Sequence, residues 1–140
     1  SHLPASEVIE CRGVDPEVYR PVQPTDSYAL ALPEERCLQG LVFRIADINL
    51  SYAQLLHPSD VLTQSQAEAC QATSQKLVEV ESLNNSQRHH SSTRLFFEPL
   101  EKGVIRRARV LGIFVPREND LQAVAECGQR FVEQKLPLTT

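Results

Sequence analysis

The segment LVFRIADINLSYAQLL (residues 41–56) decides how the fold is read, because it holds two apolar runs separated by a short polar break. The first run is rich in β-branched and aromatic residues and lacks the spacing of a buried helix face. The break at Asn49-Leu50-Ser51 includes asparagine, a residue that tolerates the positive φ of a tight turn. The segment therefore predicts an antiparallel hairpin, in which a strand over 38–48 pairs with a strand over 51–57.

The overall composition is that of one globular domain. The chain has 140 residues, of which 41% are apolar and 23% are charged, and this length can bury a sizeable core without disulfides. Its formal net charge of −4 argues against a dedicated nucleic-acid binder, which usually carries a basic surplus. No apolar run approaches the roughly 18 residues that a membrane-spanning helix needs. We therefore expect a cytoplasmic protein without a membrane segment.

The spacing of cysteines and histidines gives no support to a metal site. The four cysteines are separated by long, irregular gaps and form no C-x-x-C pair, which argues against a zinc knuckle. The adjacent His89 and His90 fall in a polar stretch with no cysteine or carboxylate close to them in sequence. We therefore expect no metal and no cofactor.

The first part of the chain is rich in proline. Four of the nine prolines lie within residues 1–26, where each removes a backbone hydrogen-bond donor. This predicts an extended N-terminal arm over 1–26 that carries short strand pieces such as 7–11. Residues 27–140 then form a single domain, which begins with a short strand over 27–32.

The middle of the chain predicts a long helix. Between Val61 and Leu83 there is no glycine or proline, and alanine, glutamine, glutamate and leucine are frequent. Ser59 or Asp60 can accept hydrogen bonds from the amides of a first turn. We therefore expect a helical insertion over about 60–84, roughly 36 Å long at 1.5 Å per residue.

The apolar stripe of this predicted helix is narrow and would be exposed on a projecting helix. An exposed apolar stripe is a liability unless another surface covers it. We expect a second copy of the chain to cover it, which makes the protein a homo-oligomer. The predicted interface residues are Leu62, Ala69, Leu77, Val80 and Leu83.

The rest of the chain predicts further strands and a final helix. Residues 84–93 are polar and are typical of a loop, and strands follow over 94–100 and 104–116. Apolar residues then recur three, four and seven positions apart, after Asn119 as a candidate N-cap. This spacing predicts a C-terminal helix over about 120–136.

Candidate ligand-binding residues gather at the hairpin and in the strand IRRARV (residues 105–110). Arg107 and Arg109 share one face of that strand and Arg106 takes the other, where they can grip an anion or simply remain solvated. No P-loop, nucleophile elbow or dinucleotide fingerprint is present, so no catalytic residue is predicted. The candidate ligand-binding residues are Arg44, Asp47, Asn49, Ser51, Arg106, Arg107 and Arg109.

Two segments resemble the PilZ domain of bacterial signalling proteins. In that family a strand runs into a D/N-x-S-x-x-G turn and a short apolar strand, and LVFRIADINLSYAQLL has this shape, with Asn49 and Ser51 as the N-x-S. The family's last strand reads roughly Gly-apolar-x-Phe before a polar break and a helix, and LGIFVPRENDLQAVAECGQRFVEQ (residues 111–134) looks like that ending. The resemblance implies a mainly β fold, a six-stranded antiparallel barrel with added helices.

The sequence departs from the family at its ligand-binding positions. Gln54 stands where the turn motif has glycine, and the R-x-x-x-R motif, whose guanidiniums hold the phosphates of cyclic di-GMP, is absent. The resemblance therefore implies a non-enzymatic bacterial signalling or adaptor domain in which cyclic di-GMP binding is weak or absent. Asn49 and Ser51 then form only a hairpin turn. The partners that the family implies are proteins of motility, pilus or signalling machinery.

Two other interpretations stay open at this point. The order strand, helix, strand, strand, helix over 41–136 is one strand short of a ferredoxin-like α+β fold, whose sheet can bind RNA. The negative charge and the scarcity of aromatic residues in 104–115 count against nucleic acid. The other interpretation is a phosphodiester-acting enzyme, because His57 and His90 each stand two positions before a serine.

Overall fold

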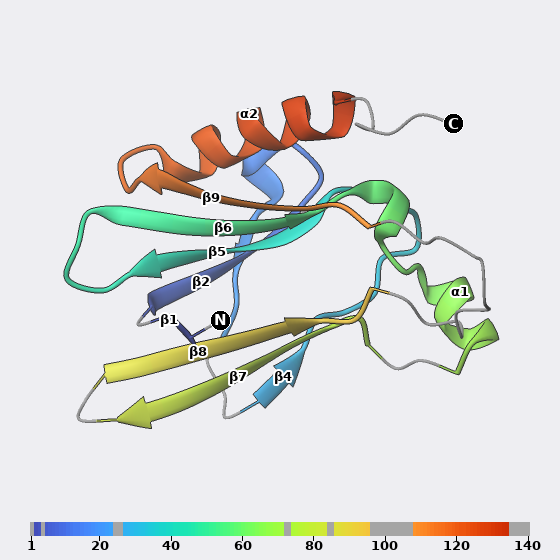
Figure 1. Cartoon of the computed structure of the whole chain (residues 1–140), viewed down its shortest axis with the longest axis horizontal. Helices are drawn as coiled ribbons and strands as arrows, with labels where there is room; N and C mark the ends of the chain where they lie inside the picture. Colours follow the sequence, from blue (N-terminus) through green and yellow to red (C-terminus); the bar gives the residue numbers. More distant parts are fainter. Residues whose placement is uncertain are drawn as a thin grey trace.

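The computed structural model describes residues 2–3, 5–23, 27–71, 74–83, 86–95 and 108–134, and in them the fold is mainly β (Figure 1). The strands are β1 (His2–Leu3), β2 (Ala5–Arg12), β3 (Arg20–Pro21), β4 (Ser27–Ala29), β5 (Gln39–Ile45), β6 (Leu50–Leu56), β7 (Lys76–Leu83), β8 (Ser86–Thr93) and β9 (Val110–Pro116). The helices are the 3-10 turns η1 (Pro16–Val18) and η2 (Pro58–Asp60) and the α-helices α1 (Gln64–Ala69) and α2 (Asp120–Glu133).

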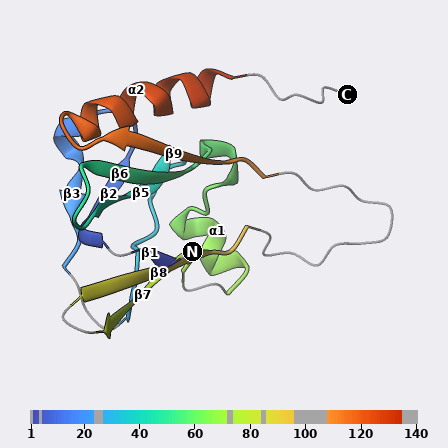
Figure 2. The same ribbon diagram turned by 60° about the vertical axis from the view of Figure 1, so that its left-hand side comes forward.

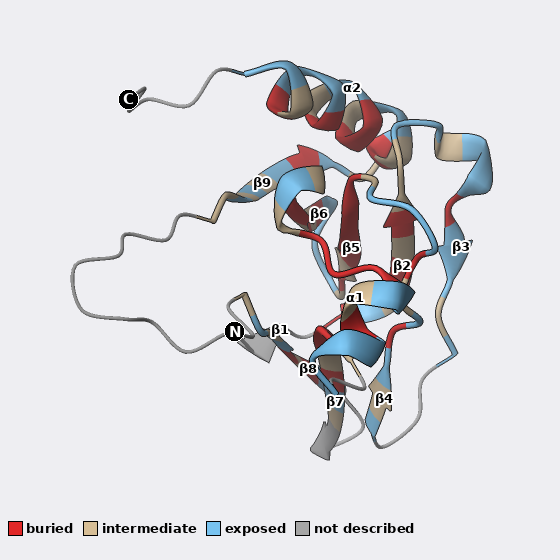
Figure 3. Cartoon of the chain, turned by 90° about the vertical axis from the view of Figure 1, so that its right-hand side faces the viewer, coloured by how far each residue is buried: buried red, intermediate tan, exposed pale blue. Residues whose placement is uncertain are grey.

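The strands form two antiparallel sheets that stack with α2 in three layers (Figures 1 and 2). The five-stranded sheet has the order β3-β2-β5-β6-β9 and the four-stranded sheet the order β1-β8-β7-β4. One apolar core, which includes Leu55 and Val124, lies between α2 and the five-stranded sheet. A second, which includes Phe43 and Val78, lies between the two sheets. The central strand β5 is therefore buried on both faces (Figure 3).

The hairpin predicted from the opening segment is confirmed. β5 and β6 pair antiparallel along almost their whole length. The turn covers residues 46–49, and Asp47 (φ 67°), not Asn49, adopts the left-handed conformation. Leu50, which the sequence placed between the two strands, already belongs to β6. The strand pattern thus located the hairpin, but the prediction that Asn49 takes the turn conformation was wrong.

The predicted C-terminal helix is confirmed as α2, which ends at Glu133, and residues from 135 onward lie outside the described residues. Its buried residues recur three and four positions apart and face the five-stranded sheet. Asn119 stands at the N-cap in the left-handed conformation without a side-chain hydrogen bond to the helix. The carboxylate of Asp120 instead accepts a hydrogen bond of 2.8 Å from the Leu121 N–H.

The predicted long helix over 60–84 is wrong. Thr63 and Gln66 form a capping box that begins α1, but the helix ends at Ala69 and Gln71 (φ 57°) redirects the chain. β7 then pairs with β4 on one side and with β8 on the other. The sequence of β7, KLVEVESL, alternates valine and glutamate, and this two-residue period is that of a strand.

Without the long helix, the predicted oligomer interface has no structural basis. Leu62 is buried inside the chain and Ala69 is exposed on α1. Leu77 lines an open polar pocket of about 530 Å³ beside α1, and Val80 and Leu83 belong to β7. Leu77, Val80 and Leu83 lie on β7, whereas Leu62 and Ala69 lie outside that strand, so the five residues do not share the face of one helix.

Three further expectations about the fold are wrong. Both sheets end in strands that have only one partner among the described residues, so these residues do not form the six-stranded closed barrel. Two stacked sheets also differ from the single sheet of the ferredoxin-like alternative. Residues expected to form the polar loop over 84–93 instead contribute β8, which lies between β1 and β7.

The remaining strand predictions are met in part. β2 includes the expected strand piece 7–11 and pairs with both β3 and β5. β9 confirms the strand over 104–116 from Val110 onward, whereas residues 96–107 lie outside the described part of the chain. Among the helices that the structure describes, none has the length and apolar character required to cross a lipid bilayer.

Candidate functional site

β9 is an edge strand whose outer side has no partner among the described residues. On its inner side, the His57 N–H donates to the carbonyl of Arg109 (3.1 Å) and the Arg117 N–H donates to the carbonyl of Asn49 (3.0 Å). Both bonds join directly opposed residues of the β6–β9 register. Because hydrogen-bonded and non-hydrogen-bonded pairs alternate in an antiparallel ladder, the odd-numbered residues of β9 turn their backbone groups toward β6.

The even-numbered residues of β9 consequently present their backbone groups to the outside. The N–H and C=O groups of Val110, Gly112 and Phe114 point away from β6, and Pro116, which lacks an N–H, ends the row. Proteins usually guard such an edge with a charge, a proline or a bulge. The segment 110–115 contains no charged residue and no proline, so β9 offers an uncharged edge to another strand.

The face of β9 that points away from α2 is apolar and exposed. Phe114 is 63% exposed and Val110 is 52% exposed. The ring of Tyr52, on β6, packs against Phe114 with 4.9 Å between ring centroids. Its hydroxyl covers Gly112, only 2.6 Å from the position that a Cβ would take there. Large exposed apolar side chains gathered on one strand are typical of an interaction surface.

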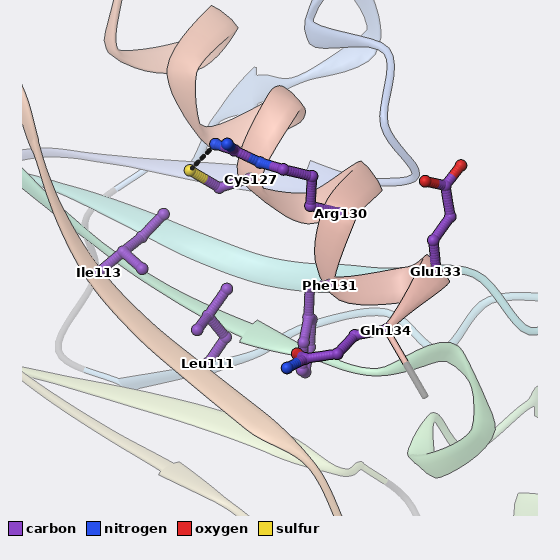
Figure 4. A pocket seen from close by; sticks show the side chains of 7 residues that line it. All are labelled: Leu111, Ile113, Cys127, Arg130, Phe131, Glu133 and Gln134. Carbon is purple, nitrogen blue, oxygen red and sulfur yellow. Dashed lines mark hydrogen bonds between the residues drawn. The ribbon is translucent and has the colours of Figure 1, made fainter. Parts of the chain in front are cut away.

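The opposite face of β9 forms one wall of an open groove of about 530 Å³, and α2 forms the other wall (Figure 4). Leu111 and Ile113 rise from β9 toward the helix, and Phe131 descends from α2 (Figure 4). The groove therefore has an apolar floor beside an open sheet edge. This arrangement suits an extended chain that adds to the sheet and places alternate side chains in the groove.

The rim of the groove is polar and carries both signs of charge. Arg130 and Glu133 are exposed on α2. The Arg130 guanidinium donates a hydrogen bond of 3.4 Å to the Cys127 sulfur (Figure 4) and makes no ion pair among the described residues. The carboxylate of Glu133 accepts a hydrogen bond of 2.7 Å from Gln129. The rim thus has one cation and one anion.

Arg44 and Ser51, two of the predicted ligand-binding residues, lie in a hydrogen-bonded cluster instead of an open site. Arg44 donates to both carboxylate oxygens of Asp120 at 2.9 and 3.1 Å, and to Glu7 at 2.9 Å. The Ser51 hydroxyl donates to Asp120 at 2.8 Å. These contacts join β2, β5 and β6 to the first turn of α2, so the groups bind one another and stabilise the fold.

The Asp120 carboxylate is almost completely buried, with 2% of the residue exposed. Burial by itself would raise the pKa of this carboxyl, but the hydrogen bonds from Arg44 and Ser51 and the charge of Arg44 lower the pKa below its usual value. Asp120 is therefore ionised at neutral pH and its charge is matched by Arg44. The polar break in the opening segment is thus a turn followed by a residue of this cluster.

The other predicted ligand-binding residues are not brought together. Asp47 and Asn49 are exposed in the hairpin turn. Arg109 lies just before β9, and its guanidinium donates to the carbonyl of Gln134 (2.8 Å) and contacts His57. Arg106 and Arg107 lie outside the described residues. The turn and Arg109 stand at opposite ends of the β6–β9 pair, so they cannot hold one small ligand.

His57 forms a second polar cluster at the start of η2. Its Nδ1 lies 2.8 Å from the Ser59 hydroxyl, and its Nε2 lies 2.9 Å from an Arg109 guanidinium nitrogen. The Ser59 N–H donates to Nδ1 (3.2 Å), and the Arg109 guanidinium, which can only donate, faces Nε2, so both ring nitrogens face donors. Burial lowers the pKa of His57 below 6.5 and the charge of Arg109 lowers it further, which keeps the ring neutral.

This arrangement differs from that of a catalytic serine–histidine pair, because Nδ1 caps η2 by accepting from the Ser59 N–H. A general base must accept the serine proton, and a carboxylate usually holds its other nitrogen. Here Arg109 holds that nitrogen instead. His90 lies on β8 in the other sheet, so the structure does not bring His57 and His90 together as a phosphodiester site requires.

Lys76 is a charged residue buried in the β structure. It is 6% exposed, at the first position of β7, and it makes no hydrogen bond or ion pair through its side chain among the described residues. Burial lowers its pKa from 10.5 to about 8, and the nearby Cys11 thiol opposes this change. Burial likewise raises the pKa of Cys11 from 9.0 to about 12. Neither group lines the groove beside α2 or the pocket beside α1.

The strongest candidate site is therefore the edge of β9 together with the groove beside it, which the sequence interpretation did not identify. The signal for it was present, because VLGIFV (residues 110–115) is an apolar run without a guarding charge. Within the part of the chain that the structure describes, no group of three or more potential metal ligands comes together. No protein-family model, curated protein or solved structure matches the chain.

Proposed function

We propose that the chain is a cytoplasmic, non-enzymatic adaptor domain that binds other protein chains by strand addition at β9. The observation that carries the proposal is the uncharged outer edge of β9, where Val110, Gly112 and Phe114 offer backbone donors and acceptors. In this binding mode main-chain hydrogen bonds supply affinity and side chains in adjacent pockets supply selectivity. The groove beneath α2 is such a pocket.

The resemblance to PilZ domains supports the same role. Domains of that family act in bacterial signalling, and some partners belong to motility or pilus machinery, which gives the expected class of partner and the cytoplasmic location. The non-enzymatic part of the proposal is supported by the His57 cluster, in which Arg109 takes the place that a carboxylate holds in catalytic pairs. The negative net charge favours a protein partner over nucleic acid.

Phe114→Lys tests strand addition, because the substitution places a charge on the exposed edge without disturbing a core. A phage-displayed library of random nine-residue peptides, selected on the wild-type protein, should yield extended peptides rich in β-branched and aromatic residues at alternate positions. We expect Phe114→Lys to weaken the binding of these peptides by about tenfold or more, which corresponds to about 1.4 kcal/mol. Fluorescence anisotropy of labelled peptides measures the change.

The matched control is Val18→Lys, because Val18 is 49% exposed on η1, away from β9. It should bind the selected peptides as the wild type does. Selected peptides that bind wild type and Phe114→Lys equally would contradict strand addition at β9.

Titration with cyclic di-GMP tests the ligand expected from the resemblance. We expect no measurable heat in isothermal calorimetry, or only weak binding. The R-x-x-x-R motif is absent from the sequence, and Arg44, on the strand that precedes the turn, is already paired with Asp120 and Glu7. A dissociation constant below about 1 μM, equivalent to about 8 kcal/mol of binding free energy, would show that the chain is a nucleotide receptor instead.

A further inference from the structure

We infer that the strand received by β9 is β9 of a second copy of this chain, paired antiparallel about a two-fold axis at Gly112. This inference rests on the proposed function, because the second copy occupies the same edge. Two copies related by a two-fold axis present the same surface to each other, so that surface must complement itself. β9 meets this condition in its backbone, its side chains and its charge.

The backbone of β9 is self-complementary in this register. With Gly112 opposite Gly112 of the second copy, Val110 stands opposite Phe114 and Phe114 opposite Val110. All three pairs join residues whose backbone groups point outward. Each such pair exchanges two hydrogen bonds in an antiparallel ladder, and the five-stranded sheets of the two copies become one continuous sheet.

The side chains of the exposed face favour the same register. The most exposed apolar residues of β9, Phe114 and Val110, become directly opposed cross-strand neighbours and cover each other. A register shifted by one step about Ile113 would instead place Phe114 opposite Gly112. That place is already filled by Tyr52, whose hydroxyl lies against Gly112, so the shifted register is disfavoured.

The groove face is compatible with this pairing as well. Leu111 of one copy stands opposite Ile113 of the other, so the apolar floors of the two grooves become continuous. No charged residue lies within 110–115, so no like charges face each other across the central pairs. Each groove rim carries one cation and one anion, Arg130 and Glu133, so two identical rims meet without net repulsion.

Light scattering coupled to size exclusion tests the assembly. The wild-type chain has a mass of 15.7 kDa, and we expect about twice this mass at micromolar concentrations. Val110→Glu and Phe114→Lys should each raise the dimer dissociation constant at least tenfold, because each places a charge opposite an apolar side chain. Val18→Lys is the control and should remain dimeric. Circular dichroism shows whether each variant is folded, and both substituted side chains are more than half exposed.

A mixing experiment tests the register itself. When Val110→Glu and Phe114→Lys chains are mixed, one cross-strand pair becomes glutamate with lysine and the other stays valine with phenylalanine. The heterodimer should therefore form in native mass spectrometry under conditions where each variant alone is monomeric. The absence of this heterodimer from a mixture of folded variants would overturn pairing about Gly112.

The two proposals fail in different ways. A wild-type chain that remains monomeric at 100 μM but binds the selected library peptides, with loss in Phe114→Lys, overturns the second copy as partner and leaves strand addition intact. A monomer that binds no peptide overturns both. A dimer whose stability is unchanged by Phe114→Lys overturns β9 as its interface.

Discussion

Asp120→Ala is expected to lower the free energy of unfolding by about 3 kcal/mol, because removal of one partner leaves the charge of Arg44 without its buried counterpart. The substitution also removes the acceptor of the Ser51 hydroxyl and of the Leu121 N–H. Arg44 keeps its contact with Glu7 and is partly exposed, so the loss is placed at the lower end of the range for buried pairs. Urea denaturation followed by circular dichroism measures it.

Glu118→Ala is the matched control for Asp120→Ala. Glu118 is an exposed carboxylate two residues before Asp120, and its removal should change stability by less than about 0.5 kcal/mol. If Asp120→Ala also changes the free energy of unfolding by less than about 0.5 kcal/mol, the cluster around Arg44 does not stabilise the contact between the sheet and α2.

The contribution of Asp120 should also disappear in acid. Its folded-state pKa lies below the usual value of 3.8, so the unfolded chain binds its proton first as the pH falls. The stabilisation is therefore fully present above about pH 4 and is lost as the pH falls through the lower folded-state pKa. The difference in stability between wild type and Asp120→Ala should shrink below pH 3.8. A constant difference between pH 5 and pH 2 would exclude this linkage.

Lys76→Met is expected to raise the free energy of unfolding by about 2 kcal/mol at pH 7, because it removes a buried ammonium that has no ionic partner among the described residues. Methionine keeps most of the apolar stem of the lysine and adapts to irregular packing. Urea denaturation of both proteins at pH 7 measures the difference. A destabilised Lys76→Met protein would show that the ammonium makes a favourable contact.

Arg88→Met is the control for Lys76→Met, since it removes one positive charge from an exposed position on the neighbouring strand β8. It should change stability by less than about 0.5 kcal/mol. Equal gains in both variants would point to net charge, and not burial, as the cause.

The advantage of Lys76→Met should also depend on pH. Lys76 has a folded-state pKa of about 8 and an ordinary value of 10.5, so the unfolded chain binds more protons between these values and wild-type stability rises with pH there. Cys11 acts in the opposite direction, because its pKa rises from 9.0 to about 12 on folding. Cys11 is present in both proteins, so its titration largely cancels from their difference, and wild type should gain on Lys76→Met between about pH 8 and pH 10.5.

The sequence predicted those elements whose local pattern and tertiary partner agree. The hairpin of β5 and β6 has two apolar runs joined by a polar turn, and α2 has a clear apolar face. The prediction for the segment of β7 was wrong because the residues before it are rich in alanine and glutamine, which favour a helix. Pairing with β4 and β8 decides its conformation instead. α1 ends without a glycine, since Gln71 takes the left-handed conformation, so no stop signal was visible.

The candidate site was harder to predict because it depends on what β9 lacks. A polar strand such as β8, SQRHHSST, cannot be told from a loop by composition, and its strand conformation depends on pairing with β1 and β7. The open edge of β9 likewise follows from its terminal place in the sheet, which one sequence does not reveal. Arg44 and Ser51 were predicted among the ligand-binding residues, but their partner Asp120 lies 76 and 69 positions away in the chain.

The order of the elements along the chain also affects how the protein folds during its synthesis on the ribosome. Leu55 faces a helix that begins only at Asp120, 65 residues later (from 55 to 120). At about 5 to 20 residues per second of synthesis, the apolar face of the nascent hairpin is exposed for roughly 3 to 13 seconds before α2 is made. During that interval the exposed apolar face can bind a chaperone. The rate of translation between Leu55 and Asp120 sets how long this binding is needed.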